Sequence, residues 1–400
     1  MTLHRAPWLV AGLCAALAPA LSAQRALHAI HGSSPTDIWA VGEAPAALHW
    51  DGRSWSEVPF GSGRGNSLYG VWAAGPRDVF AVGDGGTVLR FAGGAWSRMT
   101  VPTDQPLVAV VGRSSSDVYA LAQSSNEREA PQLLHYDGRA WTASPLPFPF
   151  RASALALAGR DVLVAGVAYF DPKPTERRQA GLVARWTGGR WVASGWDGQR
   201  VSDAVVGGAG WTGLSSAGAA LLLFGQKDDG TRVIATSSGG AWSLLPPAAS
   251  SMSNLQVRRV ALVGDGTPVA LFDGDGIGLF KDGSWSVTSS QEVMRQMMYP
   301  QPQPGATPAQ QQEAARRQQQ LMAQLQANPM LMAARMQAYN MSGAQAVWGP
   351  SADDFYVATE GGRIVHVAAG QAAIVYDATC ADPSTASANP ICRAIGTSPR

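Results

Sequence analysis

The sequence predicts an all-β protein folded as a single β-propeller, with seven four-stranded blades as the expected number and six or eight as the alternatives. A unit of about 40 residues recurs along the chain. Each unit holds four short β-prone runs separated by turns rich in glycine, as in residues 68–99, where the runs are LYGVWA, DVFAVG, TVLRF and AWSRM. The 45 glycines, 26 prolines and 14 tryptophans suit many tight turns and many aromatic contacts between sheets. Four strands in each repeat are typical of a propeller blade.

Residues 1–23 have the pattern of a secretory signal peptide. His4 and Arg5 precede a short apolar run, which is followed by the small residues of APALSA, and cleavage is expected after Ala23. The apolar run is too short for a stable membrane span. The bulky Leu13 before Cys14 disfavours lipidation of that cysteine. The pattern predicts a secreted or periplasmic protein.

An aspartate opens the second strand of most units. Residues 24–290 are expected to form blades one to six, and residues 344–400 the last blade with a closing segment. Two units, around 218–225 and 266–276, keep the apolar run but lose the aspartate. Each aspartate is expected to accept backbone N–H groups of the turn, which is a structural role. The aspartates are Asp37, Asp78, Asp117, Asp161 and Asp354.

A tryptophan follows the last glycine turn of six units, and the seventh has Ala372 instead. Each indole is expected to be a packing plug between sheets and not a ligand platform. The extra residues of units three to five, such as QSSNEREAP and AYFDPKPTERRQA, are expected in loops between the second and third strands. The tryptophans are Trp55, Trp96, Trp141, Trp191, Trp242 and Trp285.

A basic residue lies six positions before the tryptophan position in five units. The favoured interpretation is a side chain whose stem stacks along a neighbouring aromatic ring. The alternative is a ring of repeated sites for an anionic or sugar ligand. The members of this candidate ligand ring are His49, Arg90, His135, Arg185 and His366.

Residues 291–343 form a Gln/Met-rich insertion between the sixth and seventh units. Good helix formers predict a helix over 308–327, ended by Asn328-Pro329, and partial disorder is the alternative. Clustered methionines would suit Cu(I), but no histidine or cysteine supports them. A pliable apolar face is the better interpretation, which makes the insertion a candidate docking arm for a protein partner.

Cys380 and Cys392 are the two cysteines left after removal of the signal peptide, and an oxidising compartment favours a disulfide between them. The last ten residues, ICRAIGTSPR, resemble the start of a repeat unit. They are expected either to complete the ring or to begin a further unit.

The run DVFAVGDGGTVLRFAGGAWS resembles the repeat of secreted bacterial propellers of the BNR and sialidase-like type, including the photosystem II assembly factor-like group. The resemblance covers most of residues 26–380. It implies a propeller that could be a hydrolase, an assembly factor or a protein of another role. The Asp-box pattern S-x-D-x-G-x-x-W is matched only in part, by HWDGRSW and HYDGRAW, and the residues a sialidase needs cannot be assigned.

The sequence carries no H-E-x-x-H, G-x-S-x-G, phosphate-binding or paired Cys-x-x-Cys motif. Its formal net charge of +1 and its charged fraction of 15% argue against nucleic acid as a partner. The predicted function is therefore a monomeric, non-enzymatic scaffold that binds a protein and needs no cofactor or metal. A carbohydrate-binding, lectin-like propeller is the alternative, and a sialidase-like glycoside hydrolase or lyase is the less favoured one.

Overall fold

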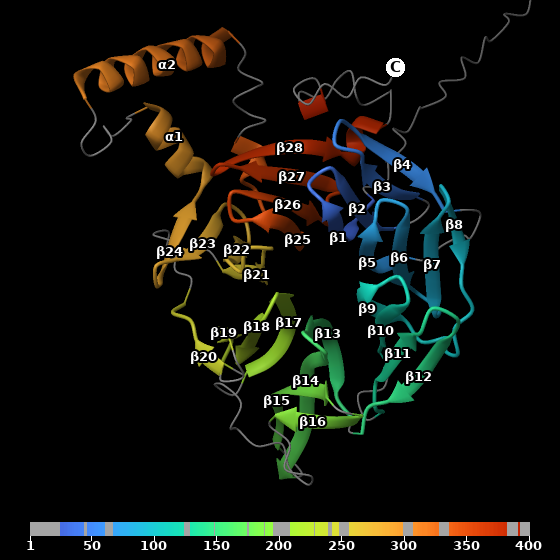
Figure 1. Ribbon diagram of the computed structural model, residues 1–400. Helices are drawn as coiled ribbons and strands as arrows, with labels where there is room; N and C mark the ends of the chain where they lie inside the picture. The colour runs from blue at the N-terminus through green and yellow to red at the C-terminus, as the bar shows by residue number, and fades with distance from the viewer. Residues whose placement is uncertain are drawn as a thin grey trace, which may run out of the picture.

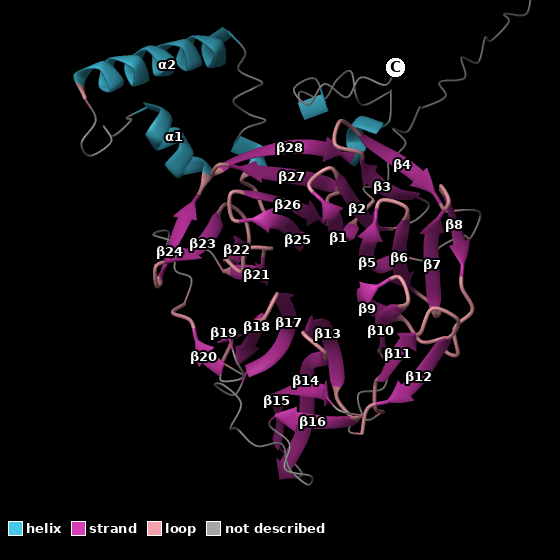
Figure 2. Ribbon diagram, in the orientation of Figure 1, coloured by secondary structure: helices cyan, strands magenta, loops and turns pink. Residues whose placement is uncertain are grey.

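The computed structural model shows seven four-stranded antiparallel sheets arranged in a ring (Figure 1), which confirms the predicted seven-bladed β-propeller. Strands make up nearly all of the ring, and helices lie at its edge (Figure 2). The structure describes residues 25–43, 46–60, 67–123, 129–147, 149–173, 176–187, 189–194, 209–227, 229–238, 242–247, 256–298, 307–327, 336–381 and 391–392.

Each blade consists of four strands that are consecutive in the chain. Blades one to four comprise β1 (Leu27–Ser34), β2 (Asp37–Gly42), β3 (Ala46–Trp50), β4 (Trp55–Pro59); β5 (Leu68–Gly75), β6 (Asp78–Gly83), β7 (Thr87–Ala92), β8 (Ala95–Arg98); β9 (Leu107–Ser114), β10 (Asp117–Ala122), β11 (Gln132–Tyr136), β12 (Trp141–Pro145); and β13 (Arg151–Ala158), β14 (Asp161–Lys173), β15 (Glu176–Thr187), β16 (Arg190–Ser194). Blades five to seven comprise β17 (Ala209–Ala217), β18 (Ala220–Lys227), β19 (Arg232–Ser238), β20 (Trp242–Leu244); β21 (Val257–Leu262), β22 (Pro268–Phe272), β23 (Ile277–Lys281), β24 (Ser284–Thr288); and β25 (Ala344–Ser351), β26 (Asp354–Thr359), β27 (Arg363–Ala368), β28 (Gln371–Asp377).

The second strand of a blade is its most buried element. All six residues of β2, DIWAVG, are buried, because this strand has a neighbouring strand on each side and a neighbouring blade against each face. The recurrent glycine that ends this strand also has a steric cause. A Cβ at Gly42 would clash with the backbone oxygen of Ala26, and one at Gly83 would clash with that of Ser67. Outermost strands such as β4 are largely exposed or half-buried.

The ring closes where β1 packs beside β25, and each described strand of the first and last blades pairs within its own blade. Of the predicted closing segment, residues 391–400, only 391–392 belong to the described residues, so its pairing stays a prediction. Cys380 and Cys392 form the expected disulfide. Ile391, next to it, is buried in the apolar cluster between blades six and seven.

The fourth blade differs from the prediction between its second and third strands. The segment 168–180 was predicted as a loop, but β14 and β15 continue through most of it as a hairpin, with Tyr169 opposite Gln179 and Phe170 opposite Arg178. Two consecutive aromatic residues favour a strand, and the extra residues of this unit lengthen the two strands in place of forming a long loop.

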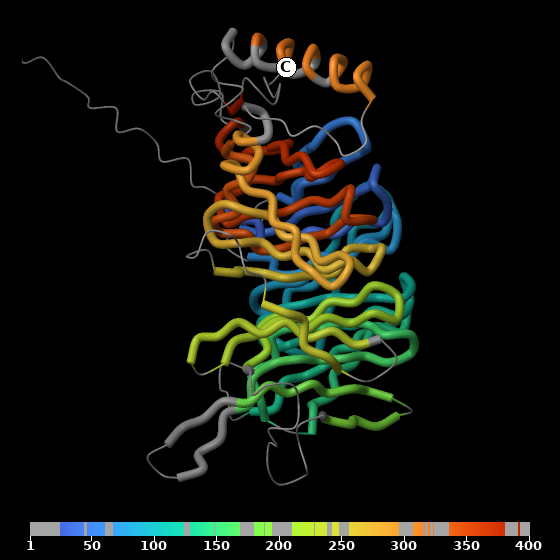
Figure 3. Tube along the Cα trace, turned by 90° about the vertical axis from the view of Figure 1, so that its left-hand side faces the viewer, coloured from blue at the N-terminus to red at the C-terminus, as the bar shows by residue number. Residues whose placement is uncertain are grey.

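The insertion contains α1 (Ser290–Met298) and α2 (Pro308–Ala327). The range of α2 is the one that the sequence predicts, whereas α1 was not predicted. The Ser289 hydroxyl accepts the N–H of Glu292 at the start of α1, and Asp275 accepts the N–H of Ser290. Helix α2 lies outside the ring (Figures 1 and 3), and all its described side chains are exposed. No described helix is long and apolar enough to cross a membrane.

Candidate functional site: the central channel

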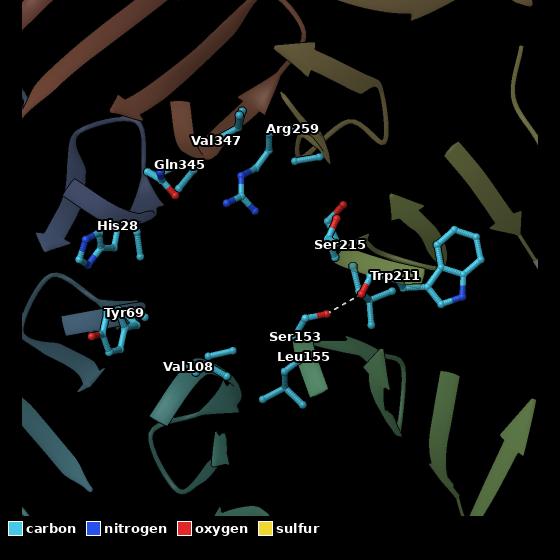
Figure 4. Close-up of a pocket in the computed structure, with 18 of the residues that line it drawn as sticks. His28, Tyr69, Val108, Ser153, Leu155, Trp211, Ser215, Arg259, Gln345 and Val347 are labelled. Carbon is cyan, nitrogen blue, oxygen red and sulfur yellow. Dashed lines mark hydrogen bonds between the residues drawn. The ribbon is translucent and has the colours of Figure 1, made fainter. Parts of the chain in front are cut away.

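The innermost strands of all seven blades surround a central cavity of about 900 Å³ (Figure 4). Gln123, Gln226 and Glu360, which lie at the ends of second strands, contribute to its lining. The cavity is therefore bordered by the face of the disc on which the second strands end. Its wall combines apolar side chains such as Val108 and Val347 with polar and charged ones.

One position of the first strand decides how open this channel is. In blade one this residue is Ala29, which pairs with Val41, the last residue but one of the second strand. The other blades have an equivalent residue in the same register. Six blades have alanine or glycine at this position, and blade six has Arg259, paired with Leu271. Small residues leave the middle of the channel free, so that the long side chain of Arg259 has room to extend into it (Figure 4). The six small residues are Ala29, Gly70, Ala109, Ala154, Gly213 and Ala346.

The residue before this position ties neighbouring blades together in three places. His28 Nδ1 lies 3.1 Å from the carbonyl oxygen of Leu68 in blade two. The Ser153 hydroxyl donates to the Trp211 carbonyl oxygen at 2.8 Å (Figure 4). Arg258 does the same in blade six, since its Nε donates to the Ala344 carbonyl oxygen at 3.3 Å. These side chains hold the ring closed around the channel.

Arg259 differs from its neighbour Arg258 in having no such role. Arg258 also forms an ion pair with Glu360, with Nη2 and Oε2 3.2 Å apart. Among the described residues Arg259 has no hydrogen-bond or ion-pair partner, and its Nε is buried without an acceptor. Burial and the nearby charge of Arg258 lower the pKa of Arg259 to about 10, so the guanidinium stays charged at neutral pH. The channel therefore contains an unpaired positive charge.

The candidate ligand ring lies elsewhere in each blade. Every one of its five basic side chains bonds to the aspartate that opens the second strand of the same blade. The carboxylates of these aspartates therefore accept hydrogen bonds from basic side chains. They were predicted to accept backbone N–H groups of the turn, and these bonds are of a different kind. The distances are 2.8 Å for His49–Asp37, 2.7 and 2.9 Å for Arg90–Asp78, 2.8 Å for His135–Asp117, 3.5 Å for Arg185–Asp161 and 2.8 Å for His366–Asp354.

The basic group in four of these blades also stacks on the aromatic ring two residues after the aspartate. The centroid distances are 4.1 Å for His49 on Trp39, 4.4 Å for His135 on Tyr119 and 4.2 Å for His366 on Tyr356, and the Arg90 guanidinium lies 5.1 Å from the Phe80 centroid. The Arg90 guanidinium is a cation and is attracted by the face of the Phe80 ring, while the three histidine rings stack on their aromatic partners. Each base is thus held on two sides within its own blade.

Blades five and six have lost both members of this pair. The positions of aspartate and base are Ala220 and Thr236 in blade five, and Thr267 and Leu279 in blade six. The two residues occur together or not at all, which indicates that they act as one unit inside the blade. A ligand for the candidate ligand ring would have to displace the aspartate from each base.

The burial of Asp37 has an electrostatic consequence. Burial raises the pKa of its carboxyl group, but hydrogen bonds from His49 and Ser33 outweigh burial and leave the pKa below its ordinary value. The carboxylate also accepts the indole N–H of Trp39 at 3.2 Å. Asp37 therefore stays ionised while it is almost completely enclosed.

The tryptophans of the outer strands contact the preceding blade. Trp55 lies 6.4 Å from Tyr356 of blade seven, Trp96 5.5 Å from Trp39, and Trp141 6.4 Å from Phe80, all between ring centroids. Trp191, Trp242 and Trp285 pack on clusters that include residues of the preceding blade.

The gap before blade seven, where Ala372 replaces the tryptophan, is filled by the end of the insertion. Tyr339 and Met341 are buried there among residues of blades six and seven. The Tyr339 hydroxyl accepts the N–H of Ala372 at 3.1 Å, and the Tyr339 carbonyl oxygen accepts the N–H of Gly276 at 3.1 Å. The return segment of the insertion is thus part of the propeller.

No group of three or more His, Cys, Asp or Glu side chains that could hold a metal ion occurs in the part of the chain that the structure describes. The clustered methionines of the insertion are Met294, Met297 and Met298, and Met330, Met332 and Met336. Most of them lie outside this part or have side chains that are not described.

Fold and channel together define a seven-bladed propeller with an open, polar central channel. No protein-family profile and no curated protein matches the sequence. Similar solved structures include "YCF48 bound to D1 peptide", with a TM-score of 0.54 and 11% identity over 86% of this chain and 92% of that one. The WD40 propeller domain of Doa1 has a TM-score of 0.52 and 10% identity over 86% and 92%, and hydrazine synthase of Kuenenia stuttgartiensis has 0.53 and 10% over 86% and 96%. At such identities the likeness concerns the fold.

Sequence inspection missed Arg259 as a candidate site residue. The repeats were aligned on the aspartate and the tryptophan, and neither marker lies on the first strand. An alignment of the first strands by themselves would have shown one arginine among six small residues.

Proposed function

We propose that this protein is a non-enzymatic propeller that binds a protein or peptide partner at its central channel and acts as an assembly scaffold. The observation that carries the proposal is the unpaired Arg259 guanidinium inside a channel of about 900 Å³. A structure of similar fold, that of YCF48, contains a bound peptide, which supports this kind of ligand for the fold.

The groups in the channel suit binding better than catalysis. General acid–base or nucleophilic catalysis needs a proton-transferring group beside a nucleophile or a second such group. The carboxylate at the channel, Glu360, is engaged by Arg258, and His28 is bonded to a backbone oxygen. The structures of similar fold include hydrazine synthase, so the fold by itself does not separate binding from catalysis.

Site-specific photo-crosslinking tests the proposal. A photo-reactive residue at Gln345, which lines the channel, is expected to give a polypeptide adduct from the extracytoplasmic fraction of the source cells. The same residue at Arg98, exposed on β8, is the matched control and is expected to give none. A third position, Gln320 on the exposed part of α2, tests the docking arm. Adducts at Arg98 alone, or at no position, would contradict the proposal.

A lectin is the second candidate, because stacked aromatic and basic groups recur around the disc. Each of those bases is bonded to an aspartate, which leaves little capacity for a sugar hydroxyl. A glycan array with the mature protein tests this candidate, and a glycosidase and lyase substrate panel tests the sialidase-like alternative. Reproducible glycan binding that survives blocking of the channel would favour the lectin.

We also propose that the protein works outside the cytoplasm, as a secreted or periplasmic protein. The signal-like residues 1–23 and the Cys380–Cys392 disulfide support this location. Mass spectrometry of the protein from fractionated cells is expected to find an N-terminus at Gln24 outside the cytoplasm. An uncleaved chain in the cytoplasm would overturn the location.

A further inference from the structure

Arg259 breaks the repeat at a first-strand position that lines the channel. Its six counterparts are alanine or glycine. Figure 4 shows its side chain extending from β21 into the open space, between Gln345 of β25 and Ser215 of β17. An unpaired buried Nε costs stability, since a buried donor without an acceptor loses its bonds to water. Among the described residues, no hydrogen bond or ion pair of Arg259 offsets this cost.

We propose that Arg259 binds a carboxylate of an extended polypeptide segment that enters the central channel. This inference rests on the proposed function and specifies the chemistry that the partner presents. A guanidinium offers a planar fork of N–H donors that matches the two oxygens of a carboxylate. The neighbouring Arg258 is neutralised by Glu360, so one free positive charge remains on this strand for one negative charge.

The wall of the channel favours a polypeptide as the carrier of that carboxylate. Val108, Leu155 and Val347 give apolar surface for aliphatic side chains, and Gln345 and Ser215 add polar groups beside the guanidinium. Sugar sites usually depend on aromatic stacking platforms. Tyr69, an aromatic ring at the channel wall, already stacks on His28 with the ring centroids 5.2 Å apart, and the large ring of Trp211 is fully buried and points away from the channel in Figure 4. A peptide terminus and an Asp or Glu side chain both carry the required group.

The substitution Arg259→Ala tests the proposal with little danger to folding, because it installs the residue that four other blades carry at this position. Arg98→Ala is the control, since it removes the same charge from an exposed outer strand. Arg259→Lys keeps the charge and removes the fork. The probes are three immobilised ten-residue peptide libraries: acidic sequences with a free C-terminus, the same sequences amidated, and Asn/Gln sequences amidated.

Wild-type protein and the Arg98→Ala variant are expected to retain acidic peptides with equal affinity. Arg259→Ala is expected to weaken binding by about 10- to 100-fold, the size of one charge-assisted contact. Arg259→Lys should fall between them. The melting temperature of Arg259→Ala is expected to equal or exceed that of the wild type, because the unpaired Nε is gone. Loss of binding on amidation identifies a C-terminal carboxylate, and equal binding of the amidated acidic library identifies an acidic side chain.

Equal peptide binding by wild type and Arg259→Ala would overturn this inference and leave the proposed function standing. Peptide binding that is independent of acidic groups would do the same. Failure of the wild type to retain any peptide would overturn both. Binding of an acidic glycan in place of peptides, lost in Arg259→Ala, would refute the polypeptide and assign the guanidinium to a sugar acid.

Discussion

Replacement of Tyr339 should separate the part of the insertion that supports the propeller from the part that is free to dock. Tyr339 is buried between blades six and seven, where six other inter-blade gaps are filled by tryptophan. Tyr339→Ala removes a large aromatic ring from a packed site, which costs about 3–5 kcal/mol. Tyr339→Phe keeps the ring but deprives the Ala372 N–H of its acceptor, and costs about 1–3 kcal/mol.

Thermal unfolding of the mature chain measures these losses. The entropy of unfolding scales with length, so for a chain of about 380 residues a loss of 3–5 kcal/mol lowers the melting temperature by roughly 4–6 °C. The matched control replaces residues 307–327, helix α2, by a short Gly/Ser linker. Its described side chains are exposed, and the change is expected to cost less than about 1 kcal/mol.

A melting temperature unchanged by Tyr339→Ala, or lowered as much by removal of α2 as by Tyr339→Ala, would refute the reasoning. The control also shows how the docking arm should be tested. Deletion of residues 291–342 would remove Tyr339 and Met341 from the blade interface, so any loss of binding could reflect damage to the ring. Removal of 307–327 alone avoids this ambiguity.

Three further substitutions are expected to change stability or its pH dependence in measurable ways. In denaturant unfolding, Asp37→Ala should cost about 3 kcal/mol and Asp354→Ala about 1 kcal/mol. The two aspartates bind histidine at the same distance of 2.8 Å, but their side chains are 4% and 36% exposed, respectively. Equal losses would contradict the role of burial. His31 is half-buried in β1, and desolvation lowers its pKa to about 4 although the charge of Asp37 raises it, so the folded protein keeps the imidazole neutral. Since the unfolded chain takes up this proton near pH 6.5, stability should fall by roughly 3 kcal/mol as the pH drops from 6.5 to 4. His31→Ser, which copies the acceptor Ser215 of blade five, should flatten this dependence, and an unchanged slope would refute it.

The fold followed from the sequence because its signals are local and repeated. A turn after every few β-prone residues, and a period near 40, leave few architectures other than a propeller. The hairpin of β14 and β15 was missed because the extra residues of this unit were expected to form a loop, while the pairing of Tyr169 with Gln179 depends on two separate segments. The helix α2 was found because its composition alone favours it.

The site was harder to predict, because its geometry depends on contacts between strands that are distant in the sequence. The bonds between aspartate and base join residues 12 to 24 positions apart, and no local pattern shows that the carboxylate reaches the side chain in place of the turn. The role of Tyr339 depends on the return of a long insertion to the ring. Arg259 is different, since the repeat itself could reveal it once the first strands are aligned.

The blades that depart from the repeat lie next to each other in the ring, which suggests that they differ in local stability from the other blades. Blades seven, one, two, three and four are contiguous and keep the pair of aspartate and base, whereas the adjacent blades five and six lack it. Arg259, which departs from the repeat on the first strand, also belongs to one of these two blades.

Fewer internal polar bonds should make blades five and six open more readily than the rest. Hydrogen exchange of the free protein is expected to be faster in β18 and β22 than in β2 and β6, although all four are second strands with buried centres. An acidic peptide bound at Arg259 should slow exchange selectively in blades five to seven, whose first strands surround the guanidinium. Uniform protection of all seven second strands, with and without peptide, would show that the two blades are as firmly held as the others and that the grouping has no energetic meaning.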